Sequence, residues 1–169
     1  MYKLLIADDE PLICAGLQAM LSWEDYNIEI VGTASDGLIA QQMIETHKPD
    51  IVIADIKMPR MTGLELAEAT AKKHGPIPVF IILTSYSDFD YMRSAIHLQV
   101  VDYLAKIKLT PEELATSITK AITLISSHKE GPQPKAPYQQ SHRELTDKFF
   151  IRLCNGLFES KEYFSRQAK

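Results

Sequence analysis

The chain has 169 residues, 46% of them apolar, which is enough for one globular domain and an additional segment. The net charge is −4 and is unevenly distributed, with −7 on residues 1–125 and +3 on residues 126–169. The acidic first part argues against a nucleic-acid-binding domain, and no apolar run is long enough to span a membrane, so we expect a cytoplasmic protein.

Short apolar runs recur along residues 1–125 and are separated by segments with helical spacing. The expected strands are Lys3–Ala7, Glu29–Ala34, Ile51–Ala54, Val79–Thr84 and Val101–Leu104. The run at 51–54 is apolar throughout, which is typical of a strand buried on both faces of a sheet. Five such strands, each followed by a helix, predict a parallel α/β sheet with helices on both faces.

The helical segments carry start and end signals. The first has an apolar face predicted to contain Leu12, Ile13, Gly16, Leu17, Met20 and Leu21. The second opens after Ser35-Asp36-Gly37, the third ends at Gly75-Pro76, and the fourth opens at Ser87-Asp88. The fifth has Thr at its N-cap and Pro at its first helical position, Thr110-Pro111, with Glu113 three residues after the cap.

The pattern changes after residue 125. Residues 126–141 contain Gly131-Pro132-Gln133-Pro134-Lys135-Ala136-Pro137, which cannot continue a helix and predicts a Pro-rich linker. Residues 142–169 contain a last amphipathic helix with Leu145, Phe149, Leu153 and Leu157 on one face. One helix cannot bury such a face by itself, so it must dock on the domain, pair with another copy or belong to a larger domain. We expect the last of these, with the segment as the start of a truncated further region.

Polar residues follow four of the five expected strands. Asp8 and Asp9 follow the first and Asp55 the third, while Thr84 ends the fourth and Lys106 follows the fifth. The carboxyl ends of parallel strands meet at one edge of the sheet. Three carboxylates there suit Mg²⁺, and a lysine with a hydroxyl suits a phosphoryl group, so we expect Asp55 to be a nucleophile in phosphoryl transfer.

Each of these residues alone also has a structural explanation. Asp8 or Asp9 can cap the first helix, and Asp55 can cap a loop. Their coincidence at four strand ends favours the chemical interpretation.

Four segments, in chain order, carry a specific resemblance. They are Leu4–Pro11, Asp50–Pro59 with Gly63, Leu83–Tyr86 and Asp102–Lys106. Through them residues 1–125, about three quarters of the chain, resemble the receiver domain of bacterial response regulators. The resemblance implies a flavodoxin-like doubly wound sheet with strand order 2-1-3-4-5. It also implies a phospho-accepting switch of a two-component system, with a sensor histidine kinase as partner, and not an enzyme beyond its own phosphorylation and dephosphorylation.

The resemblance also implies a role for each matching residue at the metal site. Asp55 would be the phosphoacceptor, and Lys106 would neutralise the phosphoryl charge. Asp9 and Asp55 would bind Mg²⁺ through their side chains, Lys57 through its backbone carbonyl and Asp8 through water.

Thr84 and Tyr103 match the switch pair of the family. On phosphorylation the Thr84 hydroxyl would move to the phosphoryl oxygens, and the Tyr103 ring would turn inward. This would repack the face made by the fourth helix, fifth strand and fifth helix, where the family often dimerises.

Residues 142–169 loosely resemble the start of the intermediate region in AraC-type transcription regulators. The resemblance implies DNA binding only through an output domain that is absent from this chain. Two surfaces are candidates for a homodimer, namely the fourth-helix/fifth-strand/fifth-helix face and the C-terminal helix.

One position departs from the family pattern. The family usually has a proline after the conserved lysine, joined by a cis bond, whereas Ile107 follows Lys106 here. A cis bond before a non-proline residue costs about 2.5–4 kcal/mol. We nevertheless expect the cis bond to be retained, because Lys106 has to reach the phosphate.

Two other functions are left open by the residues. A Mg²⁺-dependent phosphatase of the haloacid dehalogenase type also uses a strand-end aspartate, but it expects DxD, and Asp55 is followed by Ile56-Lys57. A receiver-like module that is never phosphorylated is the other alternative. Sustained turnover of a phosphomonoester would indicate the phosphatase, and stoichiometric labelling would indicate the switch.

Overall fold

A computed structural model describes residues 1–85 and 100–129 of the chain. These residues contain a five-stranded parallel sheet of order β2-β1-β3-β4-β5. The strands are β1 (Tyr2–Ala7), β2 (Ile28–Ala34), β3 (Ile51–Asp55), β4 (Val79–Thr84) and β5 (Val100–Ala105). The predicted flavodoxin-like sheet and its strand order are therefore confirmed.

The burial of each strand follows from its position in the sheet. Every residue of β3 and β4 is buried, because these two strands have neighbours on both edges and helices over both faces. The edge strand β2 includes exposed and half-buried residues, and its sequence accordingly includes Glu29 and Gly32. The uninterrupted apolar runs therefore mark the centre of the sheet, where the site is built.

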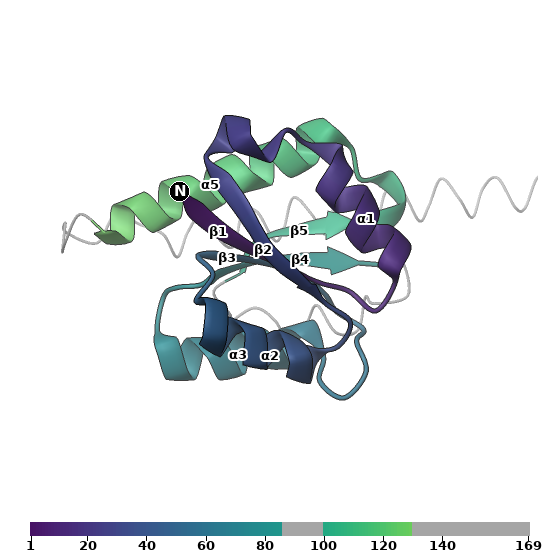
Figure 1. Cartoon of the computed structure of the whole chain (residues 1–169), viewed down its shortest axis with the longest axis vertical. Coiled ribbons are helices and arrows are strands. Elements are labelled where there is room, and N and C mark those ends of the chain that lie inside the picture. Colours follow the sequence, from purple (N-terminus) through teal and green to yellow (C-terminus); the bar gives the residue numbers. More distant parts are fainter. Residues whose placement is uncertain (86–99, 130–169) are drawn as a thin grey trace, which may run out of the picture. The chain divides into compact units, whose positions relative to one another are not determined.

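Helices cover both faces of the sheet (Figure 1). They are α1 (Pro11–Met20), α2 (Gly37–His47), α3 (Gly63–His74) and α5 (Pro111–Lys129), with 3₁₀ turns at η1 (Trp23–Tyr26) and η3 (Lys106–Lys108). Helices α1 and α5 lie on one face, and α2 and α3 lie on the other (Figure 1). Four residues of α5 are fully buried against the strands: Leu114, Ile118, Ala121 and Ile125.

The predicted end of α3 at Gly75 and the predicted start of α5 at Thr110-Pro111 are confirmed. The Thr110 hydroxyl accepts a hydrogen bond from the Glu113 N–H at 3.2 Å, and Pro111 opens α5. In α3, Thr62 and Glu65 form a capping box, and Gly75 follows the last turn. Helix α5 extends to Lys129, so residues 126–129, which were predicted to begin the linker, are helical.

Helix α1 differs from the prediction. Leu12 is 87% exposed and Gly16 is exposed, whereas Cys14 and Leu17 are buried. The predicted apolar face was wrong at Leu12 because it lies five residues before Leu17, about 140° around the helix.

The turn η1 was not predicted. Its Trp23 is buried at 8% exposure and belongs to the core, and its indole Nε1 donates to the Gln18 carbonyl at 3.0 Å. Because η1 precedes β2, it lies at the amino-terminal edge of the parallel sheet.

Several predictions lie outside the described residues and stay predictions. These are the fourth helix from Ser87, the linker from residue 130 onward and the amphipathic segment 142–169. Among the helices that the structure does describe, none combines the length and hydropathy needed to cross a bilayer.

Candidate functional site

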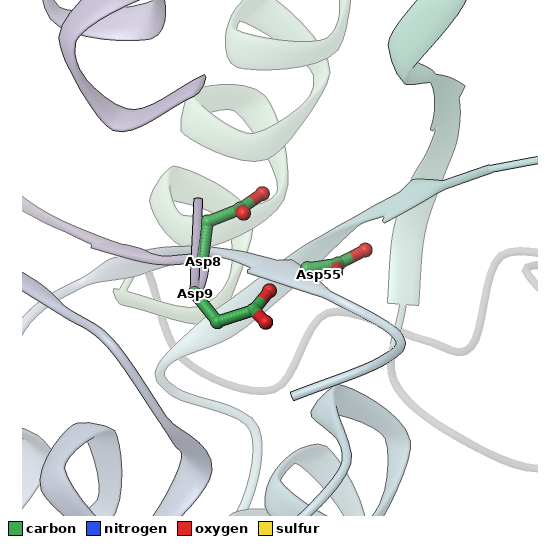
Figure 2. A group of neighbouring side chains, drawn as sticks. All are labelled: Asp8, Asp9 and Asp55. Atoms are coloured by element: carbon green, nitrogen blue, oxygen red, sulfur yellow. The ribbon is translucent and has the colours of Figure 1, made fainter. Parts of the chain in front are cut away.

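Three carboxylates meet at the carboxyl edge of the sheet. Strands β1 and β3 are neighbours in register, with Ala7 opposite Ala54, so the residues that follow are adjacent in space. One oxygen from each of Asp8, Asp9 and Asp55 lies within 4.8 Å of the others. Figure 2 shows Asp8 and Asp9 at the end of β1 beside Asp55 at the end of β3. The structure therefore brings together the carboxylates that were predicted to bind metal.

The Asp8 carboxylate has two different surroundings. Its Oδ1 accepts the Glu10 N–H at 2.9 Å, which fixes the turn into α1. Its Oδ2 is buried and lies 2.8 Å from Lys106 Nζ, in an ion pair that lacks a well-directed hydrogen bond. Asp8 thus has a local structural role through one oxygen, and its other oxygen faces the charge of Lys106 inside the site.

Lys106 contacts carboxylates from two strands. Its Nζ lies 2.8 Å from Asp8 Oδ2, 3.0 Å from Asp55 Oδ2 and 3.0 Å from Glu10 Oε1. Burial by itself would lower the pKa of Lys106, but these carboxylates outweigh that effect and raise the pKa above its usual value. The ammonium group is therefore charged and lies beside the predicted phosphoacceptor.

Negative charge is in excess at the site. The carboxylates of Asp8, Asp9, Glu10 and Asp55 lie around the ammonium group of Lys106. Asp8 and Asp55 are almost completely buried, where uncompensated charge is unfavourable. All the side-chain atoms that could bind a metal here are carboxylate oxygens, which suit a hard cation such as Mg²⁺ better than a soft metal.

The chain turns sharply after Asp55. The Ile56 N–H donates to the Leu83 carbonyl at 3.1 Å, and the Gly63 N–H donates to the Ile56 carbonyl at 3.1 Å. A Cβ at Gly63 would lie 2.2 Å from the Asp55 carbonyl oxygen, so only glycine lets α3 begin this close to the site. Lys57 lies in the loop between Asp55 and Gly63, and its side chain is exposed.

Thr84 lies on β4, next to β3, and Tyr103 lies on β5, the edge strand beyond β4. Thr84 is 3% exposed at the end of β4 and pairs in register with Ala105, directly before Lys106. Tyr103 is half-buried on β5, and burial raises its pKa to about 12. Thr84 thus ends its strand as predicted, and the switching role of Thr84 and Tyr103 stays a prediction.

Two features of the site region were not predicted. Glu10 belongs to the acidic run after β1, but its contact with Lys106 was not predicted from the sequence. Arg60, in the loop after β3, forms an ion pair with Asp36 at the start of α2. No sequence signal points to this pair, because its members are 24 residues apart and both lie outside regular strands.

The predicted cis bond after Lys106 was wrong. In the part of the chain that the structure describes, the cis peptide bond is the one before Pro78, so the Lys106–Ile107 bond is trans. The η3 turn at Lys106–Lys108 lets Lys106 Nζ reach Asp8 and Asp55 without a cis bond. The chain thereby avoids the cost of about 2.5–4 kcal/mol of a non-proline cis bond.

Comparison with known proteins shows what the chain is similar to. Residues 4–119 match the family described as the response regulator receiver domain. The transcriptional regulatory protein HptR of Staphylococcus aureus is 35% identical over 146 residues, which cover 86% of this chain and 56% of that protein. An uncharacterized response regulatory protein of Staphylococcus epidermidis is 45% identical over 106 residues, covering 63% of this chain and 41% of that protein. The chain spans about half the length of these curated relatives.

Solved structures of response regulators are also similar to this chain. The REC domain of AraT, a response regulator from Geobacillus stearothermophilus, has a TM-score of 0.70 and 35% identity, covering 76% of this chain and 98% of that one. A two component transcriptional regulator AraC from Clostridium phytofermentans has a TM-score of 0.71 and 30% identity, covering 78% and 100% of the two chains.

Proposed function

Because this chain belongs to the response regulator receiver domain family, we propose that Asp55 accepts a phosphoryl group from a sensor histidine kinase in a Mg²⁺-dependent reaction. Receiver domains bind Mg²⁺ at an acidic pocket and are signalling switches rather than classical enzymes. The observation that carries the proposal is the position of the Asp55 carboxylate, 3.0 Å from Lys106 Nζ and next to Asp8 and Asp9.

The transfer would exchange one bond for another. An Asp55 carboxylate oxygen would form a bond to phosphorus while the nitrogen–phosphorus bond of a phosphohistidine breaks, and the imidazole would leave. The metal, when bound, would neutralise charge on the transferred oxygens. Lys106, which pairs with Asp55 Oδ2 in this structure, would pair with a phosphoryl oxygen instead.

The oxygen ligands for Mg²⁺ would come from two adjacent strand ends. We assign the side chains of Asp9 and Asp55 and the backbone carbonyl of Lys57 as ligands, with Asp8 acting through water. The support is the convergence of the three carboxylates and the lack of a directed hydrogen bond at buried Asp8 Oδ2.

The phosphoryl group would then act on the neighbouring strands. The Thr84 hydroxyl would bond to it and Tyr103 would turn inward, changing the surface of β5 and α5. We propose that this surface, or the segment 142–169, forms a homodimer that controls a transcriptional output domain outside this chain. Relatives named as transcriptional regulators support an output of this kind, and the cytoplasmic location stays a prediction.

Intact-mass spectrometry after incubation with acetyl phosphate and Mg²⁺ tests the phosphoacceptor. We expect one phosphoryl adduct on the wild-type chain, none on Asp55→Asn, and none when Mg²⁺ is chelated. The Asp50→Asn variant is the matched control, since Asp50 lies at the opposite end of β3 and accepts the Lys3 N–H. An adduct that survives Asp55→Asn would contradict the assignment.

A further inference from the structure

The loop of residues 56–62 begins directly after Asp55 and is attached to α2. Arg60 lies in this loop with φ of +66°, a conformation that non-glycine residues seldom adopt unless their surroundings hold them in it. Its guanidinium group forms an ion pair and a hydrogen bond with the Asp36 carboxylate. An unusual backbone conformation and a charged contact thus occur at the same residue.

Asp36 is itself held firmly. Its side chain is 9% exposed, and its Oδ1 accepts the Leu38 and Ile39 N–H groups at 2.9 Å each, as the N-cap of α2. Its other oxygen, Oδ2, contacts Arg60. The hydrogen bond from Arg60 lowers the pKa of Asp36, so the pair is ionised at neutral pH. The 56–62 loop is therefore attached, through Arg60, to the N-cap residue of α2.

Backbone contacts reinforce the same attachment. The Gly37 N–H donates to the Pro59 carbonyl at 3.4 Å, and a Cβ at Gly37 would lie 2.2 Å from the Met61 carbonyl oxygen. The loop thus packs on the first residue of α2 on both sides of Arg60. Its first end is set by Asp55 in β3, and its last end by the capping box of α3.

We propose that Arg60 and Asp36 form a positioning pair that sets the conformation of the 56–62 loop and thereby the Lys57 carbonyl at the metal site. Lys57 lies between Asp55 and Arg60, so holding Arg60 on α2 restricts the conformations open to the residues between them. Neither member of the pair is assigned a contact with the phosphoryl group, and the pair would act through the loop. This inference rests on the proposed function, because it needs Mg²⁺ to bind at Asp55.

Calorimetric titration with Mg²⁺ tests the pair in the unphosphorylated chain. We expect Arg60→Met and Asp36→Asn each to weaken Mg²⁺ binding about tenfold, which is the usual effect of losing a partner that orients metal ligands. The double variant should be no weaker than either single variant, because both remove one interaction. Arg60→Lys, which keeps the charge, should restore most of the affinity.

Two controls separate this effect from a loss of stability. Asn is as good an N-cap as Asp, so Asp36→Asn removes the ion pair and keeps the cap. If Arg60→Met does not fold, the Mg²⁺ affinity of Asp36→Asn by itself tests the positioning pair. Lys73→Met breaks another ion pair that involves α2, with Glu45 at 2.7 Å, and should leave the Mg²⁺ affinity unchanged.

The outcomes are distinguishable. If Arg60→Met and Asp36→Asn bind Mg²⁺ within about twofold of the wild type, far from the usual tenfold loss, the positioning pair is wrong and the proposed function stands. If the wild-type chain itself binds no Mg²⁺, the proposed function is wrong, and the inference that depends on it is wrong as well.

Discussion

Lys106 and Lys73 both join elements that are distant in sequence, and they do so in opposite surroundings. The Lys106 side chain is 8% exposed and pairs with Asp8 and Asp55, whose side chains are 0% and 5% exposed. Lys73 is 63% exposed and pairs with Glu45, which is 38% exposed. The nitrogen–oxygen distances are similar, at 2.8–3.0 Å for Lys106 and 2.7 Å for Lys73. The contacts of Lys106 with Asp8 and Asp55 therefore differ from the Lys73–Glu45 pair in solvent exposure rather than in length.

This difference indicates what each pair is for. An exposed pair is screened by water and contributes about 0–1 kcal/mol. A buried pair costs desolvation energy that its attraction only partly offsets, so it is weak evidence for stability. Lys106 and its partners are therefore better explained by the chemistry of the strand ends than by holding the fold together. Lys73 and Glu45 form an ordinary surface pair, and neither residue belongs to the strand-end site.

Removing Lys106 should have the largest effect on stability. Lys106→Met would remove a buried cation from beside the buried carboxylates of Asp8 and Asp55, and we expect the free energy of unfolding in the absence of Mg²⁺ to fall by about 3 kcal/mol. Urea denaturation measures this change, with Lys73→Met as the matched control at about 0.5 kcal/mol. Equal losses in the two variants would remove the distinction between the buried and the exposed pair.

Adding Mg²⁺ should act on the buried site and not on the exposed pair. A cation that binds only the folded chain stabilises it by about 2.7 kcal/mol at 100 times its dissociation constant. We expect thermal melts to shift upward with Mg²⁺ in the wild type and in Lys73→Met, and much less in Asp9→Asn. The same ionic strength supplied as NaCl is the control, and a shift in Asp9→Asn as large as in the wild type would argue against Asp9 as a ligand.

The exposed pair should show a small effect that depends on pH. Hydrogen bonds from Lys73 and then His74 lower the pKa of Glu45 from its usual 4.5, so the folded state favours the ionised carboxylate. The stability that this provides is present above pH 4.5 and is lost as the pH falls through the lowered value in the folded state. At pH 7 we expect Glu45→Gln to melt about 2 °C or less below the wild type, as for other surface pairs.

The two curves should converge on acidification, because the glutamine resembles the protonated glutamate. A difference in melting temperature that grows as the pH falls below 4.5 would have the wrong sign for a lowered pKa.

The sequence predicts the parts of this molecule that depend on local pattern. The apolar runs of β3 and β4 and the cap at Thr110-Pro111 each carry their own signal. Once the strands are parallel, the meeting of Asp8 and Asp55 follows without further information, because strand ends share an edge. The fold and the acidic cluster can therefore be predicted from the sequence.

Other features depend on how loops close in space, which no local pattern records. The Arg60–Asp36 pair needs two loops to meet, and one of its residues has a positive φ. The trans bond after Lys106 depends on the reach that the η3 turn provides. Leu12 was misplaced because an apolar residue in the first turn of a helix can project into solvent rather than onto the sheet.

The burial of Trp23 has a practical consequence for each of these measurements. It is the sole tryptophan of the chain, and it is packed in the core at the amino-terminal edge of the sheet, whereas Asp55 ends its strand at the opposite edge. Intrinsic tryptophan fluorescence should therefore follow global unfolding with little interference from the acidic pocket. Spectroscopic detection of metal or phosphoryl binding would need a second fluorophore placed near β3, or a method such as mass spectrometry that does not use the indole.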